Sequence, residues 1–115
     1  MVQGDERKLP AEFAQLLAPR LVRALDHPAR RKILRVLDRG AEGLTLRELT
    51  AAIPSASVSV IGYHVQVLVK CGCVSAGATA PDPRGALQEF RSSVGEDRLV
   101  VGALRATQDL DALGG

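Results

Sequence analysis

A histidine and two cysteines near the middle of the chain have the residue types of a metal or redox site. Cys71 and Cys73 form a Cys-Gly-Cys sequence, and His64 precedes the first cysteine by seven residues. A structural zinc site takes four ligands, whereas Cys-x-Cys supplies only two thiolates. The spacing therefore favours small buried hydrophobic side chains, and we expect no metal and no cofactor. A thiol-based redox switch is the alternative that the pair leaves open.

The remaining residues form no recognisable catalytic set. The sequence has no GxGxxG, P-loop, HExxH or GxSxG pattern. His27 precedes a proline at an expected helix start and has no evident cysteine or serine partner. We therefore expect that the protein is not an enzyme.

Basic side chains crowd residues 20–39, whereas residues 96–111 are acidic on balance. The only acids in the basic segment are Asp26 and Asp38, and the formal net charge of the whole chain is +2. The basic residues there are Arg20, Arg23, Arg30, Arg31, Lys32, Arg35 and Arg39. Such asymmetry favours one face that binds a polyanion, and the alternative is a solvated helix surface.

The elements that position these residues are predicted to form one domain. A chain of 115 residues has the usual size of a single domain. Aromatic residues make up 3% and Trp is absent, so the core must consist of Leu, Val, Ile and Ala. We expect a flexible tail over residues 1–10, a domain over residues 11–115 and no membrane span. The charged N-terminus lacks an apolar secretory segment, which predicts a cytoplasmic location.

Three helices are predicted before residue 40. Residues 11–18 form the first, and Pro19 suits the first turn of the second. The third covers "DHPARRKILRVLDRG", with Asp26 as its N-cap and Gly40 in the left-handed conformation after its last turn. Its apolar face would consist of Ile33, Leu34 and Leu37.

The next segment, "TLRELTAAIP", predicts a fourth helix that is short. Thr45 and Glu48 have the spacing of a capping box, in which each side chain satisfies a free backbone N–H at the helix start. Leu46, Leu49 and Ile53 would form its apolar face, and the helix ends before Pro54.

The segment "SVSVIGYHVQVLVKCGCV", residues 57–74, predicts a longer fifth helix. Strand-like alternation at its start fails at Ile61, whereas the helical period continues. Ser57, or alternatively Ser55, would be the N-cap, and Gly72 would end the helix. The apolar stripe consists of Ile61, Val65 and Leu68, and the opposite stripe consists of Ser59, Gly62, Tyr63, Gln66 and Lys70. One stripe would face the core and the other a partner.

The last part of the chain predicts a β-hairpin and a final helix. Residues 73–80 and 86–92 would be the strands, with the turn-rich "PDPRG" at 81–85 between them and Phe90 facing inward. A single helix is expected over residues 96–113. Its stripe consists of Leu99, Ala103, Ala106, Leu110 and Leu113.

This order of elements is typical of a winged helix-turn-helix, mainly α with a small β-hairpin. Residues 45–72 would be the helix-turn-helix, whose second helix enters the major groove of DNA. Residues 73–93 would be the wing. The fold class would be a three-helix core plus a wing, flanked by N-terminal and C-terminal helices.

The segments "RALDHPARRKILRVLDRG", "LTLRELTAAI", "SVSVIGYHVQVLVKCGCV" and "PRGALQEFRS" resemble successive blocks of the ArsR-type winged-helix transcription regulators. The resemblance covers roughly residues 21–92. It implies a small bacterial protein that binds operator DNA as a homodimer. The first and last helices would form the dimer interface, through Leu21, Leu25, Leu99, Ala103, Ala106, Leu110 and Leu113.

Metal-responsive members of that family carry Cys pairs in the helix before the recognition helix, or His and acidic sets on the last helix. The corresponding segments here, "LRELTAAI" and "EDRLVVGALRATQDLDA", contain neither Cys nor His. The resemblance therefore implies no metal sensing, and no small-molecule effector is identified.

The positions in these blocks imply specific DNA contacts. The recognition helix would span residues 57–71, where Gln66 can pair with adenine edges and Val58 or Val60 can touch thymine methyl groups. Arg30, Arg31 and Lys70 are candidates for phosphate contacts, and Arg84 at the wing tip could enter a minor groove. The full expected set is Ser57, Val58, Ser59, Val60, Gly62, Tyr63, Gln66, Lys70, Arg30, Arg31 and Arg84. No arginine lies on the recognition face, so affinity would depend on phosphates and DNA shape.

We therefore interpret the sequence as that of a sequence-specific DNA-binding transcription regulator. The alternatives are a winged-helix module that binds a protein without reading DNA, and a redox-sensing regulator that uses Cys71 and Cys73. The operator sequence, the regulated genes and the direction of regulation are not encoded in any pattern of the chain.

Overall fold

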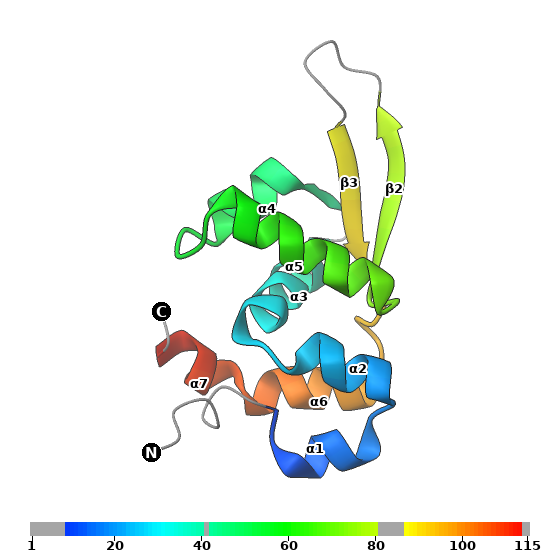
Figure 1. Cartoon of the computed structure of the whole chain (residues 1–115), viewed down its shortest axis with the longest axis vertical. Coiled ribbons are helices and arrows are strands. Elements are labelled where there is room, and N and C mark those ends of the chain that lie inside the picture. Colours follow the sequence, from blue (N-terminus) through cyan, green and yellow to red (C-terminus); the bar gives the residue numbers. More distant parts are fainter. Residues whose placement is uncertain (1–8, 41, 81–86, 114–115) are drawn as a thin grey trace.

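The computed structural model describes residues 9–40, 42–80 and 87–113. The expected fold class is confirmed: the protein is mainly helical with one small antiparallel sheet (Figure 1). The helices are α1 (Ala11–Leu16), α2 (Pro19–Leu25), α3 (Pro28–Arg39), α4 (Leu46–Ala52), α5 (Val58–Lys70), α6 (Arg98–Ala106) and α7 (Gln108–Leu113). The strands are β1 (Leu44–Thr45), β2 (Val74–Ala80) and β3 (Leu87–Ser92).

Helix α3 lies at the centre of the molecule, between α4 and α5 on one side and α2 and α6 on the other (Figure 1). Its predicted apolar face is confirmed, because Ile33, Leu34 and Leu37 are buried. The predicted N-cap was wrong: His27 caps α3, and its Nδ1 accepts a hydrogen bond of 3.0 Å from the N–H of Ala29. The carboxylate of Asp26 instead accepts from the N–H of Leu9.

Two expectations near the ends of these helices were also wrong. Gly40 has a φ of −98°, so it does not adopt the left-handed conformation; Gly43, with φ 87°, does so three residues later. Leu9, assigned to a flexible tail with the other residues of 1–10, is buried in the core. Residues 1–8 of that tail lie outside the described residues.

Helices α4 and α5 begin and end as the sequence predicts. The capping box of Thr45 and Glu48 is present, and the hydroxyl of Ser57 accepts from the N–H of Val60 at 3.2 Å. Gly72 has a φ of 78°, and its N–H donates to the carbonyl of Val69. This glycine lets the chain leave α5 and enter β2 without strain.

The sheet contains a strand that the sequence pattern did not reveal. Its order is β1-β3-β2, so β3 pairs with the wing strand β2 and with the two residues of β1. Leu44 lies opposite Phe90, which is buried as expected. Because β1 leads directly into α4, the wing is tied to the start of the helix-turn-helix as well as to the end of α5.

The single C-terminal helix predicted over 96–113 is divided into α6 and α7 at Thr107. The Thr107 hydroxyl donates to the carbonyl of Ala103 at 2.8 Å. The guanidinium of Arg35 donates to the carbonyl of Leu104, also at 2.8 Å. The Ala103 carbonyl also keeps the backbone N–H of Thr107 at 3.1 Å, whereas Arg35 occupies the Leu104 carbonyl that the next turn of a continuous helix would use. None of the helices that the structure describes is long and apolar enough to cross a membrane.

Candidate nucleic-acid interface

The outward face of α5 combines exposed apolar and polar side chains. Val58 is 50% exposed, Val60 44% and Tyr63 62%. The side chains of Ser57, Ser59, Gln66 and Lys70 are also exposed. This set, with the half-buried Gly62, is called the recognition face below. The residues of α5 that the sequence assigned to DNA contact are therefore exposed, apart from the half-buried Gly62.

The opposite face of α5 fixes the helix to the core. Ile61, Val65 and Leu68 are fully buried. At the edge between the two faces, Gly62 lies beside α4: a Cβ built at this position would lie 3.6 Å from Leu46 Cδ2, an ordinary van der Waals contact. Burial of side chains of this size contributes about 1.5–3 kcal/mol each, which offsets the low helix propensity of the valines and Ile61.

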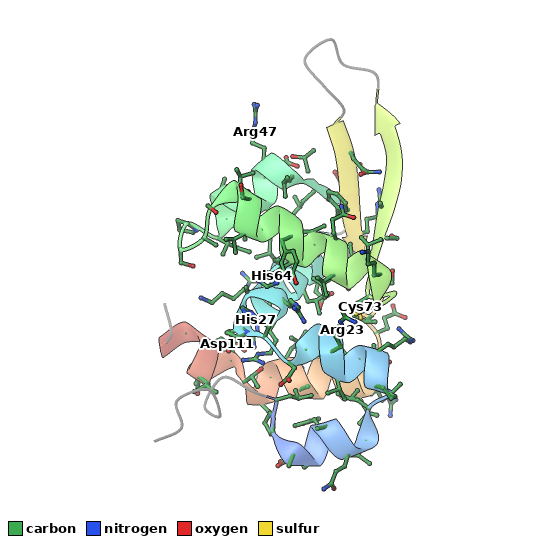
Figure 2. All side chains as sticks on the ribbon, viewed as in Figure 1. Arg23, His27, Arg47, His64, Cys73 and Asp111 are labelled. Atoms are coloured by element: carbon green, nitrogen blue, oxygen red, sulfur yellow. The ribbon has the colours of Figure 1, made fainter. Side chains whose placement is uncertain are left out.

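His64 lies at the junction of α5 and the start of α3, where it is buried (Figure 2). Its ring lies 4.4 Å from the ring of His27, and Tyr63 meets it edge-on at 5.1 Å. Burial, and to a smaller extent the neighbouring His27 and Arg30, lower the pKa of His64 from 6.5 to about 4. The imidazole is therefore neutral near pH 7, so it positions α5 and Tyr63 and carries no charge toward a phosphate.

Arg30 was expected to contact a phosphate, but in this structure its side chain is hydrogen-bonded to His64 of α5. Its Nε donates to Nδ1 of His64 at 3.2 Å, and its Nη1 donates to the carbonyl of Arg23 at 2.6 Å. The residue is half-buried. Its side chain is thus engaged at the α2–α3–α5 junction.

Arg31, the other expected phosphate contact on α3, was assigned wrongly. Its side chain is fully buried and forms two hydrogen bonds with the carboxylate of Asp111, at 2.9 and 2.7 Å. Arg35 donates to the same carboxylate at 2.7 Å. Burial raises the pKa of Asp111, but the hydrogen bonds from the two arginines outweigh this effect and leave the pKa below its ordinary value. Arg31 therefore fastens α7 to α3.

Other cations remain at the surface near the recognition face. Lys70 is exposed at the end of α5. Arg47, which the sequence analysis did not assign, is exposed on α4 and projects away from the ribbon (Figure 2). Its position at the start of the first helix of a helix-turn-helix was the signal that could have identified it. Arg84 and the expected wing tip, residues 81–85, lie outside the described residues.

The two cysteines are small core residues at the end of α5. Both are buried. Burial raises the pKa of the Cys73 thiol to about 11, and the neighbouring Cys71 raises it in the same direction. Among the described residues, no three His, Cys, Asp or Glu side chains are grouped so as to hold a metal ion.

The residues assigned to a dimer interface are divided between the core and the surface. Leu21, Leu25 and Ala103 are buried within the chain itself, so their assignment to an interface was wrong. Leu99, Ala106 and Leu110 are exposed. The side chain of Leu113 lies outside the described part of the chain. Leu16 on α1, which was not assigned, is 66% exposed.

Comparisons with known proteins agree with this arrangement. A family model described as a helix-turn-helix domain matches residues 25–72. A solved structure, described as that of a protein with a GntR superfamily winged-helix-turn-helix domain from Halomicrobium mukohataei, superimposes with a TM-score of 0.60 at 20% identity. The match covers 90% of this chain and 76% of that chain. No curated protein matches the sequence significantly.

Neither match distinguishes the ArsR type from other winged-helix groups. The structural match establishes the fold, and the sequence match covers the helices that carry the recognition face. The chain therefore has a winged helix-turn-helix fold, in which α4 and α5 form the helix-turn-helix and β2 and β3 form the wing.

Proposed function

We propose that the protein is a sequence-specific DNA-binding transcription regulator that inserts the recognition face of α5 into the major groove. The observation that carries this proposal is the exposed face itself. Val58, Val60 and Tyr63 project from a helix whose other face is buried, in the position of the second helix of a helix-turn-helix. Exposed apolar groups gathered in such a position are typical of an interaction surface.

The chemistry of the recognition face favours particular bases. Gln66 has the donor and acceptor geometry for adenine, and the valine methyl groups match the thymine C5-methyl in the major groove. The recognition face carries no arginine, so the commonest guanine contact is missing. Lys70 and Arg47 supply charge for phosphates on either side. We expect direct base readout mainly at A·T pairs, with phosphate contacts supplying most of the affinity.

The test is selection of bound sequences from a pool of random DNA duplexes. A DNA-binding regulator should recover a reproducible motif, and its affinity should fall steeply between 50 and 200 mM salt, because phosphate contacts release counterions. If no DNA is bound even at low salt, the proposal fails. An inverted repeat among the selected sequences would also report a two-fold symmetric dimer.

We further propose that the protein acts as a homodimer through the surface of α1, α6 and α7. Leu16, Leu99 and Leu110 are exposed there, on elements that lie away from the recognition face (Figure 1). Leu110→Glu should place a charge in the interface and shift the sedimentation of the protein to that of a monomer. Gln108→Glu adds the same charge at another exposed position of α7 and should remain dimeric. Unchanged sedimentation of Leu110→Glu would exclude this interface.

The second candidate function is a winged-helix module that binds a protein partner. The exposed Val58, Val60 and Tyr63 favour it, because apolar surface also suits protein contacts. Absence of DNA binding in the selection experiment would leave this function in place. The redox alternative is disfavoured because the raised pKa of Cys73 keeps its thiol protonated near pH 7.

A further inference from the structure

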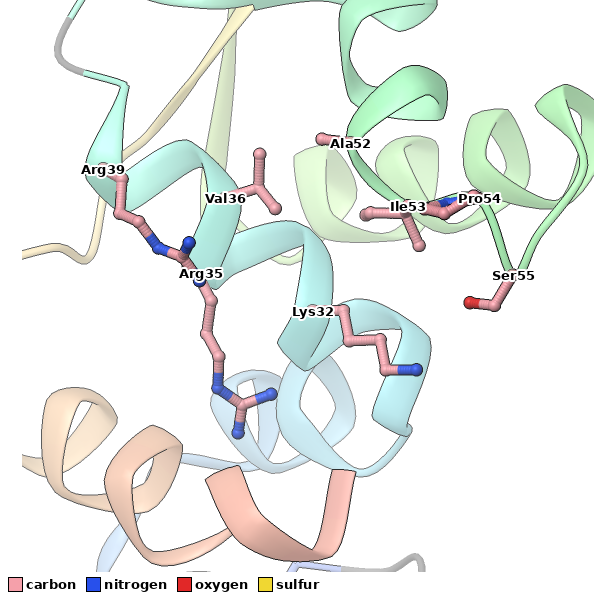
Figure 3. Close-up of a pocket in the computed structure, with 8 residues that line it drawn as sticks. All are labelled: Lys32, Arg35, Val36, Arg39, Ala52, Ile53, Pro54 and Ser55. Atoms are coloured by element: carbon pink, nitrogen blue, oxygen red, sulfur yellow. The ribbon is translucent and has the colours of Figure 1, made fainter. Parts of the chain in front are cut away.

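A groove of about 270 Å³ lies between α3 and the turn that joins α4 to α5 (Figure 3). Lys32, Val36 and Arg39 line it from α3, and Ile53, Pro54 and Ser55 line it from the turn. It lies beside the helix-turn-helix and contains no residue of the recognition face. Neither the fold nor the proposed DNA contacts assign it a role.

The charged wall of the groove is positive and uncompensated. The side chains of Lys32 and Arg39 form no hydrogen bond or ion pair with any residue that the structure describes. Arg35 lies between them in the sequence, but its terminal nitrogens are occupied by Asp111, Thr107 and the carbonyl of Leu104. Among the described residues, no acidic side chain lines the groove. Two cations are therefore available to a ligand from one helix.

The other surfaces of the groove are apolar. Val36 contributes from α3, and Ile53, whose side chain is otherwise buried, and Pro54 contribute from the turn. A bare inorganic anion would leave the apolar surface of the groove exposed to water. An uncharged apolar molecule would leave the two cations without a partner. At about 30 Å³ for one water molecule, the volume suits a ligand of about nine non-hydrogen atoms.

We propose that this groove binds a small amphipathic anion. Its carboxylate pairs with the basic wall that Lys32 and Arg39 provide on α3, and its short hydrocarbon body packs against Val36, Ile53 and Pro54. Hydrogen bonds to charged groups are the stronger class, so the two cations supply the orientation, while the apolar side supplies burial. The ligand touches both α3 and the turn, which places it where it bears on the position of α5.

The site can be tested on the free protein, independently of any DNA. Octanoate is the probe, and 1-octanol is the uncharged molecule of matched length. Isothermal titration calorimetry measures the affinity. The NMR chemical shifts of the Val36 and Ile53 methyl groups show where the probe binds. Octanoate should bind at least about tenfold more tightly than 1-octanol, since charged hydrogen bonds contribute at this level. The shifts should be confined to residues of the groove.

Matched variants identify the groups responsible. The double variant Lys32→Gln/Arg39→Gln should weaken octanoate binding about tenfold or more. The control Arg23→Gln/Arg98→Gln removes the same charge from two other exposed positions and should bind normally. Ser55→Glu, at an exposed position of the turn, should also prevent binding by repulsion if the double variant does not fold.

Several results would overturn the proposal. Equal affinity for octanoate and 1-octanol would mean that the charge plays no part. Normal octanoate binding by Lys32→Gln/Arg39→Gln would likewise mean that these two charges play no part. No octanoate binding by the wild type would mean that the groove is not a site for such an anion. If the double variant binds octanoate normally but loses DNA affinity, Lys32 and Arg39 are phosphate contacts and do not hold the anion.

Discussion

The junction between α3 and α7 and the recognition face of α5 place polar and apolar side chains in opposite ways. At the junction, charged groups lie inside: Arg31 is fully buried, and Asp111 is its partner. On the recognition face, Val58, Val60 and Tyr63 lie outside. The first region pairs its charged groups within the chain and leaves only Arg35 Nε without a hydrogen-bond partner among the described residues. The second leaves apolar surface uncovered. The buried charged groups therefore stabilise the arrangement of the helices, whereas the exposed apolar groups are accessible to a binding partner.

The same contrast shows that residue type alone is a poor guide to role. A cluster of arginines on α3 has the composition of a phosphate-binding surface, yet two of its members hold α7 in place. A buried ion pair costs desolvation, so its main contribution is to specify which surfaces meet. Removing one partner is costly, because it leaves a buried charge uncompensated.

The largest effect is expected from Asp111→Ala. This change leaves Arg31 buried without its carboxylate and should lower the free energy of unfolding by about 3–5 kcal/mol. Urea denaturation measures it. Asp109→Ala removes an exposed acid from the same helix and should change stability by no more than about 0.5 kcal/mol. Equal effects of the two changes would contradict the distinction between the regions.

The pH dependence of stability should also show that a buried side chain, His64, is held in its neutral form. The pKa of His64 is about 4 in the folded chain and 6.5 when unperturbed, so the unfolded state binds the proton first. The contribution of His64 to stability should therefore be constant well above pH 6.5 and fall between pH 6.5 and 4, by at most ~1.4 kcal/mol for each pH unit. His64→Asn, which does not titrate, should show a shallower slope in denaturation experiments. Identical slopes would show that His64 is not held neutral.

Tyr63→Ala should affect binding and spare stability. We expect the affinity for selected DNA to fall by about 1–3 kcal/mol if the ring lies in the groove. Stability should change little, because the side chain is mostly exposed. Fluorescence anisotropy and urea denaturation give the two quantities, and Tyr63→Phe serves as the control that keeps the ring. A loss of stability without a loss of affinity would mean that Tyr63 supports the fold and does not contact DNA.

The smallest effect is expected from the valine contacts. Replacing thymine by uracil in the selected duplex removes the C5-methyl group and should weaken binding by about 0.8 kcal/mol for each contacted methyl. Val60→Ala should weaken binding to the thymine duplex and reduce the difference between the two duplexes. Equal binding of thymine and uracil duplexes by the wild type would show that the valines do not read methyl groups.

Local features of the fold could be predicted from the sequence. The period of Ile61, Val65 and Leu68 identified α5 and its buried face, and Ser57 and Gly72 marked its ends. These signals act over a few residues, so one segment contains all of the information. The exposed side of α5 followed from the same period.

Features that depend on distant partners could not be predicted in this way. Arg31 resembles its neighbours in the sequence, and its assignment to the core depends on Asp111, which lies 80 residues away. The division at Thr107 depends in turn on Arg35 of α3. Strand β1 has two residues, and only its pairing with β3 defines it. A periodic pattern within one segment cannot predict such contacts between residues that are distant in the sequence.

The pairing of Arg31 with Asp111 also has a consequence for folding during synthesis. Translation adds about 5–20 residues per second, so the 80 residues between the two positions take about 4–16 s. Throughout that interval, the nascent chain contains α3 without the carboxylate that Arg31 needs in the interior. The core around α3 therefore reaches its final packing late, and helper proteins that bind incomplete chains have seconds in which to act on it.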